Sequence, residues 1–209
     1  MAILFALSYS LFPHYQSLGR ARLQLQFADL TVVFDIDGIP ATLVICRDGR
    51  HPELYRLPAM AGAKIFWSRG NGWLVCAAVD LLELVPDHRD AGFVREVGVA
   101  ALKAMATYQD ASGYFCHVLD DPRSNLEASG GLMFAYAVAK AARLGLDVEE
   151  LVPAALRALS AVAGGVEPSG KVPGVAVPPG GPGVPFDWAP FGQGFFLLAA
   201  GELAGRLEA

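Results

Sequence analysis

The chain has few charged residues and no cluster of positive ones. Asp, Glu, Lys and Arg make up 18% of its 209 residues, against about 25% in an average soluble protein. Lys and Arg together number 16, no basic run occurs, and the formal net charge is -5. Nucleic acids bind to concentrated positive charge. The composition therefore argues against a nucleic acid as the main partner.

Cysteine is also scarce. Cys46, Cys76 and Cys116 are an odd, widely spaced set without a C-x-x-C pair, which argues against a disulfide framework and against a zinc site of common spacing. We expect neither a metal nor a cofactor. Cys76 lies in an apolar helical run, so we expect a buried, inert thiol. This cysteine usage favours a reducing, cytoplasmic location.

A long apolar segment is missing at the start of the chain. Residues 1–7 are apolar, but they are too few to span a membrane and lack the positively charged start of a secretory leader. We expect a buried segment there and no membrane partner, with secretion as the less favoured alternative.

Apolar residues are abundant, at 54%, and their spacing changes along the chain. Residues 31–34 and 41–45 are β-branched runs around a turn-like segment, which predicts strand, turn, strand. After Trp73, apolar residues recur at three- and four-residue steps, which predicts helices. The expected helices cover 74–85, 93–108, 129–144, 148–162 and 192–207. We assign 1–63 as an N-terminal segment of irregular or β-like structure and 64–209 as a helical domain portion.

Similar loops recur between the predicted helices. They begin at Asp48-Gly49, Asp110-Ala111-Ser112-Gly113 and Glu167-Pro168-Ser169-Gly170, and a helix follows each loop after a glycine-containing corner. This is a repeat of roughly 60 residues, and it predicts an all-α fold of α/α-toroid hairpins with the long loops at one end. A closed ring of six such hairpins needs roughly 340 residues, so we expect an incomplete barrel. An open helical solenoid or an irregular bundle is the alternative.

One segment concentrates the side chains that suit a flat, polar ligand. Trp67, Arg69, Asn71 and Trp73 lie within seven residues, interrupted by two glycines. Indoles offer wide apolar faces, a guanidinium offers a planar fork for a carboxylate, and glycine lets the backbone approach a ligand. A sugar ring, and a uronic acid in particular, has this shape and chemistry.

Four motifs together carry a family resemblance. They are Phe66-Trp67-Ser68-Arg69-Gly70-Asn71-Gly72-Trp73, Gln109-Asp110-Ala111-Ser112-Gly113-Tyr114, Asn125-Leu126-Glu127-Ala128-Ser129 with the following Met133-Phe134-Ala135-Tyr136-Ala137, and Phe191-Gly192-Gln193-Gly194. In this order, over residues 64–205, the chain resembles the unsaturated glucuronyl and rhamnogalacturonyl hydrolases of glycoside hydrolase families 88 and 105. The resemblance implies an (α/α)6 barrel and an oligosaccharide substrate with an unsaturated uronic acid at its non-reducing end.

The resemblance also implies the chemistry. In these families a carboxylic acid protonates the C4=C5 double bond, water adds at C5, and the resulting hemiketal opens and releases the sugar. Arg69 would pair with the uronate, and the remaining substrate-binding candidates are Trp67, Asn71, Trp73, His117, Glu127 and Gln193. Core packing is the alternative for the tryptophans, a buried structural pair for Arg69, a helix-terminus role for Glu127, and a solvated loop position for His117.

The catalytic acid of the family lies in an Asp-Gly-Leu-like segment upstream of the tryptophan-arginine motif. Asp37-Gly38-Ile39 matches that local pattern, so Asp37 is the candidate acid. Only 66 residues precede Trp67, and they do not match the expected helical hairpins. We therefore expect a truncated family member, with two alternatives: an inactive relative that binds carbohydrate or acts as a scaffold, and a chain that self-associates to cover an open barrel.

The same segment supports an alternative of another class. Residues 32–38 resemble the D-x-D-G motif of haloacid-dehalogenase-like phosphatases, with Asp35 as nucleophile, Asp37 as acid/base and Mg²⁺ bound. That fold requires strands and helices to alternate along the rest of the chain.

Overall fold

The computed structural model describes residues 31–36, 39–44, 57–58, 64–177 and 184–207. Its contacts divide the chain into two units, residues 1–66 and residues 67–209. Among the described residues, no helix combines the length and the apolar character needed to cross a membrane.

The first unit contains two small antiparallel sheets. Strand β1 (Thr31–Ile36) pairs with β2 (Ile39–Val44) in a register that runs from Ile36 opposite Ile39 to Thr31 opposite Val44. Strand β3 (Leu57–Pro58) pairs with β4 (Lys64–Ile65). The two predicted strands are confirmed. The candidate acid Asp37 lies outside the described residues.

The second unit is helical, as predicted. It contains α2 (Ser68–Leu84), α3 (Ala91–Ala106), α4 (Ala128–Arg143), the 3-10 helix η2 (Glu149–Leu151), α5 (Val152–Ala163) and α6 (Pro190–Leu207). The loops between them carry β5 (Phe115–Cys116) paired with β6 (Leu126–Glu127), and β7 (Val175–Ala176) paired with β8 (Phe186–Asp187). The phosphatase alternative is wrong, because β1 pairs antiparallel with the next strand and the described chain beyond Ser68 is not an alternating α/β fold.

Helix α2 begins at Ser68, earlier than the predicted start at Leu74. The segment 68–73 contains two glycines, which have low helix propensity, and tertiary packing overrides that preference. A Cβ on Gly72 would lie 2.7 Å from Met133 Sδ of α4, so the glycine permits a close approach of the two helices. The predicted corner before the helix is therefore the first turn and a half of the helix itself.

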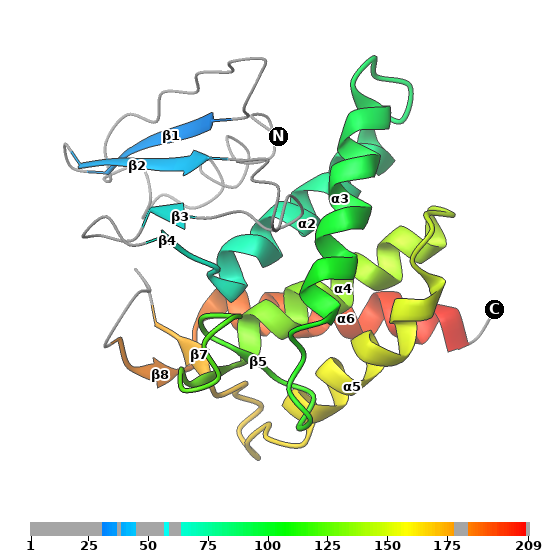
Figure 1. Ribbon diagram of the computed structural model, residues 1–209. Helices are drawn as coiled ribbons and strands as arrows, with labels where there is room; N and C mark the ends of the chain where they lie inside the picture. Colours follow the sequence, from blue (N-terminus) through cyan, green and yellow to red (C-terminus); the bar gives the residue numbers. More distant parts are fainter. Residues whose placement is uncertain (1–30, 37–38, 45–56, 59–63, 178–183, 208–209) are drawn as a thin grey trace. The chain divides into compact units, whose positions relative to one another are not determined.

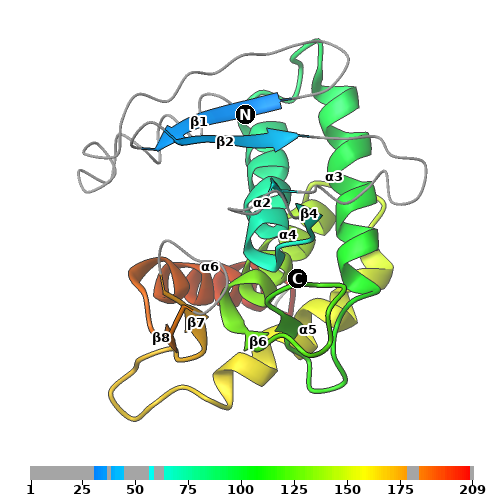
Figure 2. The ribbon, with the colours of Figure 1, turned by 60° about the vertical axis from the view of Figure 1, so that its left-hand side comes forward.

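Helix α4 is the centre of the helical unit. Every residue from Ala128 to Ala141 is buried, because α2, α5 and α6 all pack around it. Figures 1 and 2 show α4 enclosed by these helices, with α3 packed against α2. A helix buried on all sides is typically apolar all round, which explains the alanine-rich sequence of α4.

The repeat that the sequence predicts is present in the loops. Gly113 and Gly170 both have positive φ, at 93° and 85°, and each donates its N–H to the carbonyl three residues earlier, at 2.9 and 2.8 Å. Two helix starts are each hydrogen-bonded to the loop that comes after that helix's own hairpin: Ser68 N of α2 donates to His117 O, and Ala128 N of α4 donates to Gly174 O, at 3.0 and 2.9 Å. Figure 1 shows β5, β7 and β8 together at one end of the helical unit.

Candidate substrate site

Three helices begin close together at this end of the unit. A Cβ on Gly130, in the first turn of α4, would overlap Ser68 Oγ in the first turn of α2. A Cβ on Gly192, in the first turn of α6, would lie 2.6 Å from Val175 of β7. Each helix N-terminus carries partial positive charge. Their convergence favours an anion at this end of the unit.

The Arg69 side chain lies at the centre of this arrangement. The residue is 3% exposed, and its Cζ lies 4.8 Å from the Trp67 ring centroid and 4.9 Å from that of Phe191. Its Nη1 donates a hydrogen bond to Ala176 O in β7. A guanidinium held between aromatic faces keeps one plane. Its N–H groups therefore have a defined direction, as bidentate carboxylate recognition requires.

Glu127 lies next to this cluster and is fully buried. It is the N-cap of α4: Oε2 accepts from Gly130 N at 2.7 Å, and Oε1 accepts from Ser129 Oγ at 2.5 Å. Oε1 also accepts from Ala176 N at 3.2 Å. The structure thus shows the helix-terminus role considered for Glu127. The predicted contact with substrate remains a prediction.

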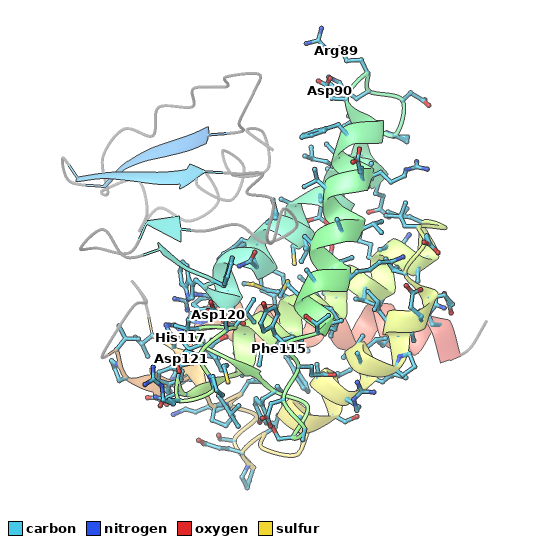
Figure 3. All side chains as sticks on the ribbon, viewed as in Figure 1. Arg89, Asp90, Phe115, His117, Asp120 and Asp121 are labelled. Carbon is cyan, nitrogen blue, oxygen red and sulfur yellow. The ribbon has the colours of Figure 1, made fainter. Side chains whose placement is uncertain are left out.

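His117 follows β5 and is only 6% exposed, so the alternative of a solvated loop histidine is wrong. Its ring centroid lies 6.3 Å from that of Trp67 and 5.5 Å from that of Phe186, both edge to face. Figure 3 shows His117 at the end of the unit opposite Arg89 and Asp90. His117 therefore contacts the same aromatic cluster that holds Arg69.

The Trp67 side chain lies beside Arg69 and carries one buried polar atom. Its side chain is half-buried, and its Nε1 is buried with no hydrogen-bond partner among the described residues. Ser68 Oγ is also buried and has no hydrogen-bond partner among the described residues. A buried indole N–H without an acceptor is costly unless a ligand supplies one, and sugar hydroxyls are suitable acceptors.

The other predicted residues make contacts within α2 or with neighbouring segments. Asn71 Nδ2 donates to Trp67 O at 2.9 Å, within the first turn of α2. Trp73 is 38% exposed and packs edge to face on Phe195, with centroids 5.3 Å apart. Gln193 accepts from Val172 N at 2.5 Å and donates to Gly170 O at 3.0 Å, so its side chain links α6 to the loop after α5. Their substrate contacts stay predictions.

The structure therefore brings Trp67, Arg69, His117 and Glu127 together. Sequence reasoning missed the part played by Phe186 and by the Ala176 backbone, and it gave Phe191 no role. Phe191 stands in the last of the four motifs, but nothing in the sequence shows that it faces Arg69. In the described part of the chain, no group of three or more His, Cys, Asp or Glu side chains is placed to hold a metal ion.

Comparison with known proteins assigns this arrangement to a family. The family model described as Glycosyl Hydrolase Family 88 matches residues 46–207. Protein Atu3128 of Agrobacterium fabrum is 38% identical over 104 residues, covering 48% of this chain and 45% of that protein. The unsaturated 3S-rhamnoglycuronyl hydrolase of Formosa agariphila is 31% identical over 148 residues, covering 67% of this chain and 39% of that protein. The chain thus spans less than half the length of these curated relatives.

Solved structures agree with the sequence comparisons. A possible member of the GH105 family from Salmonella enterica superposes with a TM-score of 0.69 at 28% identity, over 78% of this chain and 47% of that one. The unsaturated glucuronyl hydrolase of Bacillus sp. GL1 superposes with a TM-score of 0.55 at 16% identity, which shows the fold alone. The predicted α/α-toroid fold and the predicted family are both confirmed. The chain belongs to glycosyl hydrolase family 88.

Proposed function

We propose that the protein acts on oligosaccharides that end in an unsaturated glucuronyl or galacturonyl residue, and that it hydrates the C4=C5 double bond of that residue. The family supports this class of substrate, and two relatives with this type of name are similar to the chain over 67% and 52% of its length. We further propose that the protein works in the cytoplasm.

The observation that carries the proposal is the placement of Arg69. A guanidinium buried between two aromatic rings, at the point where three helices begin, is suited to a carboxylate rather than to a neutral sugar. In our proposal it binds the C6 carboxylate of the uronate. The carboxylate is conjugated with the double bond, so this contact also fixes the plane of the reacting atoms.

The aromatic side chains around Arg69 would then enclose the sugar ring. Trp67 offers its face and its Nε1–H donor, and His117 lies beside it. Trp73, exposed near the start of α2, would extend this wall outward. Aromatic faces suit the apolar faces of a pyranose ring, and the indole donor would fix its orientation through a hydroxyl.

The reaction needs one acid and one positioned water. The acid protonates the C4=C5 bond at C4, water attacks C5, and the product is a hemiketal at C5 that opens to release the next sugar. We propose Asp37 as this acid, on the strength of the Asp37-Gly38-Ile39 pattern alone.

The test is to incubate the protein with an unsaturated uronyl disaccharide and to follow the loss of absorbance of the conjugated double bond. We expect loss with the wild type, no loss with Asp37→Asn, and a strongly raised KM with Arg69→Ala. Arg89→Ala is the matched control, because Arg89 is an exposed arginine at the far end of the unit.

Two other outcomes have clear meanings. If the wild type leaves the double bond intact but binds the disaccharide, and Arg69→Ala abolishes binding, the protein is a carbohydrate-binding relative without the activity. If the wild type neither hydrates nor binds the sugar, the proposed function is wrong.

We also propose that two copies of the chain associate through one face of α6. Leu197 and Leu198 on that face are 69% and 48% exposed. A Cβ added at Gly194, Gly201 or Gly205 would meet no atom of the described chain within 4 Å. An antiparallel pairing about Gly201 would set Leu197 of each copy over Gly205 of the other, a large side chain over a small one. This pattern is self-complementary, as a two-fold interface requires.

Sedimentation velocity over a range of protein concentrations tests this association. We expect a concentration-dependent dimer, and we expect Leu197→Asp to give a monomer. Leu84→Asp is the control, because Leu84 is equally apolar and is 64% exposed on a different helix. A wild type that is monomeric throughout would exclude the α6 interface.

A further inference from the structure

Arg69 and Glu127 contact the same residue of β7 from two different helices. Ala176 donates its N–H to Glu127 Oε1 at 3.2 Å, and Ala176 O accepts from Arg69 Nη1. All three residues are buried. The carboxylate at the start of α4 and the guanidinium at the start of α2 are therefore linked through one residue of backbone.

This link is rigid on the Glu127 side. The carboxylate is fixed by Gly130 N and by Ser129 Oγ, both in the first turn of α4. The neighbouring Ala128 N donates to Gly174 O at 2.9 Å. This bond fixes where β7 packs along α4. The position of Glu127 therefore sets the position of the Ala176 carbonyl. That carbonyl in turn orients one N–H of the Arg69 guanidinium.

Helix capping alone does not explain a glutamate at this position. Ser, Thr, Asp and Asn are the preferred N-cap residues because a short side chain reaches the first free N–H groups. Burying a carboxylate is costly unless its hydrogen bonds are made. The additional length of glutamate is used here to reach Ala176 N while the cap to Gly130 N is kept.

We propose that Glu127 is a positioning residue that orients the Arg69 guanidinium through the backbone of Ala176, and that it thereby sets the preference of the site for a carboxylate sugar. This inference rests on the proposed function, in which Arg69 binds the uronate.

Glu127→Asp separates positioning from capping. Aspartate keeps the charge and is a preferred N-cap, but it is one methylene shorter and cannot reach Ala176 N. We expect the cap to Gly130 N to be kept, some loss of stability because the buried Ala176 N–H is left unpaired, and an affinity for an unsaturated uronyl disaccharide about 10-fold lower, as for one lost hydrogen bond to a charged group. Affinity for the methyl ester of the same disaccharide should change little, because the ester carries no charge for Arg69 to bind.

The measurements are calorimetric titrations with the disaccharide and its ester, urea unfolding, and hydrogen exchange of the Ala176 amide. Exchange at Ala176 should accelerate in Glu127→Asp without any ligand present. Ser129→Ala is the control: it removes one contact of the cap but leaves the Ala176 link, so it should lower stability and leave the preference for the carboxylate. Glu127→Gln, which keeps the length of the side chain and only one of its two acceptor oxygens, should lose part of the preference.

The outcomes are distinct. If Glu127→Asp binds both sugars as the wild type does, or weakens both equally, Glu127 is a cap only and the inference is wrong. If the wild type itself does not prefer the carboxylate sugar to its ester, the proposed function fails first, and the positioning role is overturned with it.

Discussion

The two ends of helices α2, α4 and α6 differ in the partners of their charged side chains. Near their C-terminal ends, Lys140 Nζ lies 2.7 Å from Asp80 Oδ1 and 2.6 Å from Glu83 Oε2. Arg143 lies 2.9 Å from Glu83 and 2.8 Å from Glu202. Each of these charges is matched by side chains of the neighbouring helices.

At the N-terminal ends, two buried charges, Arg69 and Glu127, make hydrogen bonds to backbone groups of β7 and α4. Arg69 donates to Ala176 O between two aromatic rings, and Glu127 accepts from Ala176 N and Gly130 N. The dipole of α4 favours Glu127 at its start and Lys140 and Arg143 in its last turn, since helix C-termini favour cations and N-termini favour anions. The C-terminal end links the helices through ion pairs between side chains, and the N-terminal end carries the candidate site.

The largest expected effect at the C-terminal end follows from Lys140→Met. Lys140 is 7% exposed, and its removal leaves the Asp80 carboxylate without its cation and leaves Glu83 paired with Arg143 alone. We expect a loss of about 3 kcal/mol in the free energy of unfolding, measured by urea unfolding, with uronate binding unchanged. Lys103→Met is the control, because Lys103 pairs with exposed Asp147 and Glu150 and should matter much less. An equal loss in both variants would remove the distinction between the network and a surface pair.

A comparable effect at the other end is expected from Gly130→Ala. The new methyl group would overlap Ser68 Oγ, so the first turns of α2 and α4 would have to separate. Overpacking of this kind costs about 1 to 3 kcal/mol. Because the separation moves Arg69, affinity for the uronate should fall as well, unlike in Lys140→Met. Unchanged affinity in a destabilised Gly130→Ala protein would show that the two helix starts do not form one site.

The C-terminal network also predicts a dependence on pH. Hydrogen bonds from Lys140 and then from Arg143 lower the pKa of the Glu83 carboxyl below its ordinary value of 4.5. A lowered pKa in the folded state means that the unfolded chain binds the proton more readily, so this stabilisation is present above pH 4.5 and is lost as pH falls through the lowered pKa. Urea unfolding along an acid series should show this loss, and it should be smaller in Glu83→Gln. If the free energy of unfolding depends on pH equally in the wild type and in Glu83→Gln, the loss of stability in acid does not come from Glu83.

The smallest expected effect has the opposite sign. In Gly201→Ala the new methyl group meets no atom of the described residues within 4 Å, and alanine has a higher helix propensity than glycine by up to about 1 kcal/mol. We expect a small gain in the stability of the monomer, measured by urea unfolding at low protein concentration, together with weaker dimerisation. Destabilisation of the monomer would show that this face of α6 is already in contact.

Much of the fold could be predicted from the sequence because apolar periodicity and loop repeats are local signals. The helices after Trp73, the hairpin at 31–44 and the turns at Gly113 and Gly170 all follow from residue types within a few positions. The early start of α2 could not be predicted, because glycine has a low helix propensity and the close approach of Gly72 to Met133 involves a helix distant in the sequence.

The candidate site was predictable in composition but not in geometry. The tryptophan-arginine motif indicated Trp67 and Arg69 directly. The placement of Phe191 and Ala176 around them depends on contacts across more than 100 residues of chain, which no local pattern encodes. The burial of His117 likewise comes from aromatic rings on other segments.

The central claim is that the N-terminal ends of α2, α4 and α6 hold a uronate through Arg69. Calorimetric titration of the wild type, Arg69→Ala and Arg89→Ala with an unsaturated uronyl disaccharide and its methyl ester tests it most directly. We expect the wild type and Arg89→Ala to prefer the carboxylate sugar by at least about 100-fold, as for two hydrogen bonds to a charged group, and Arg69→Ala to lose that preference. Equal affinity of the wild type for the two sugars, or a preference that survives in Arg69→Ala, would contradict the claim.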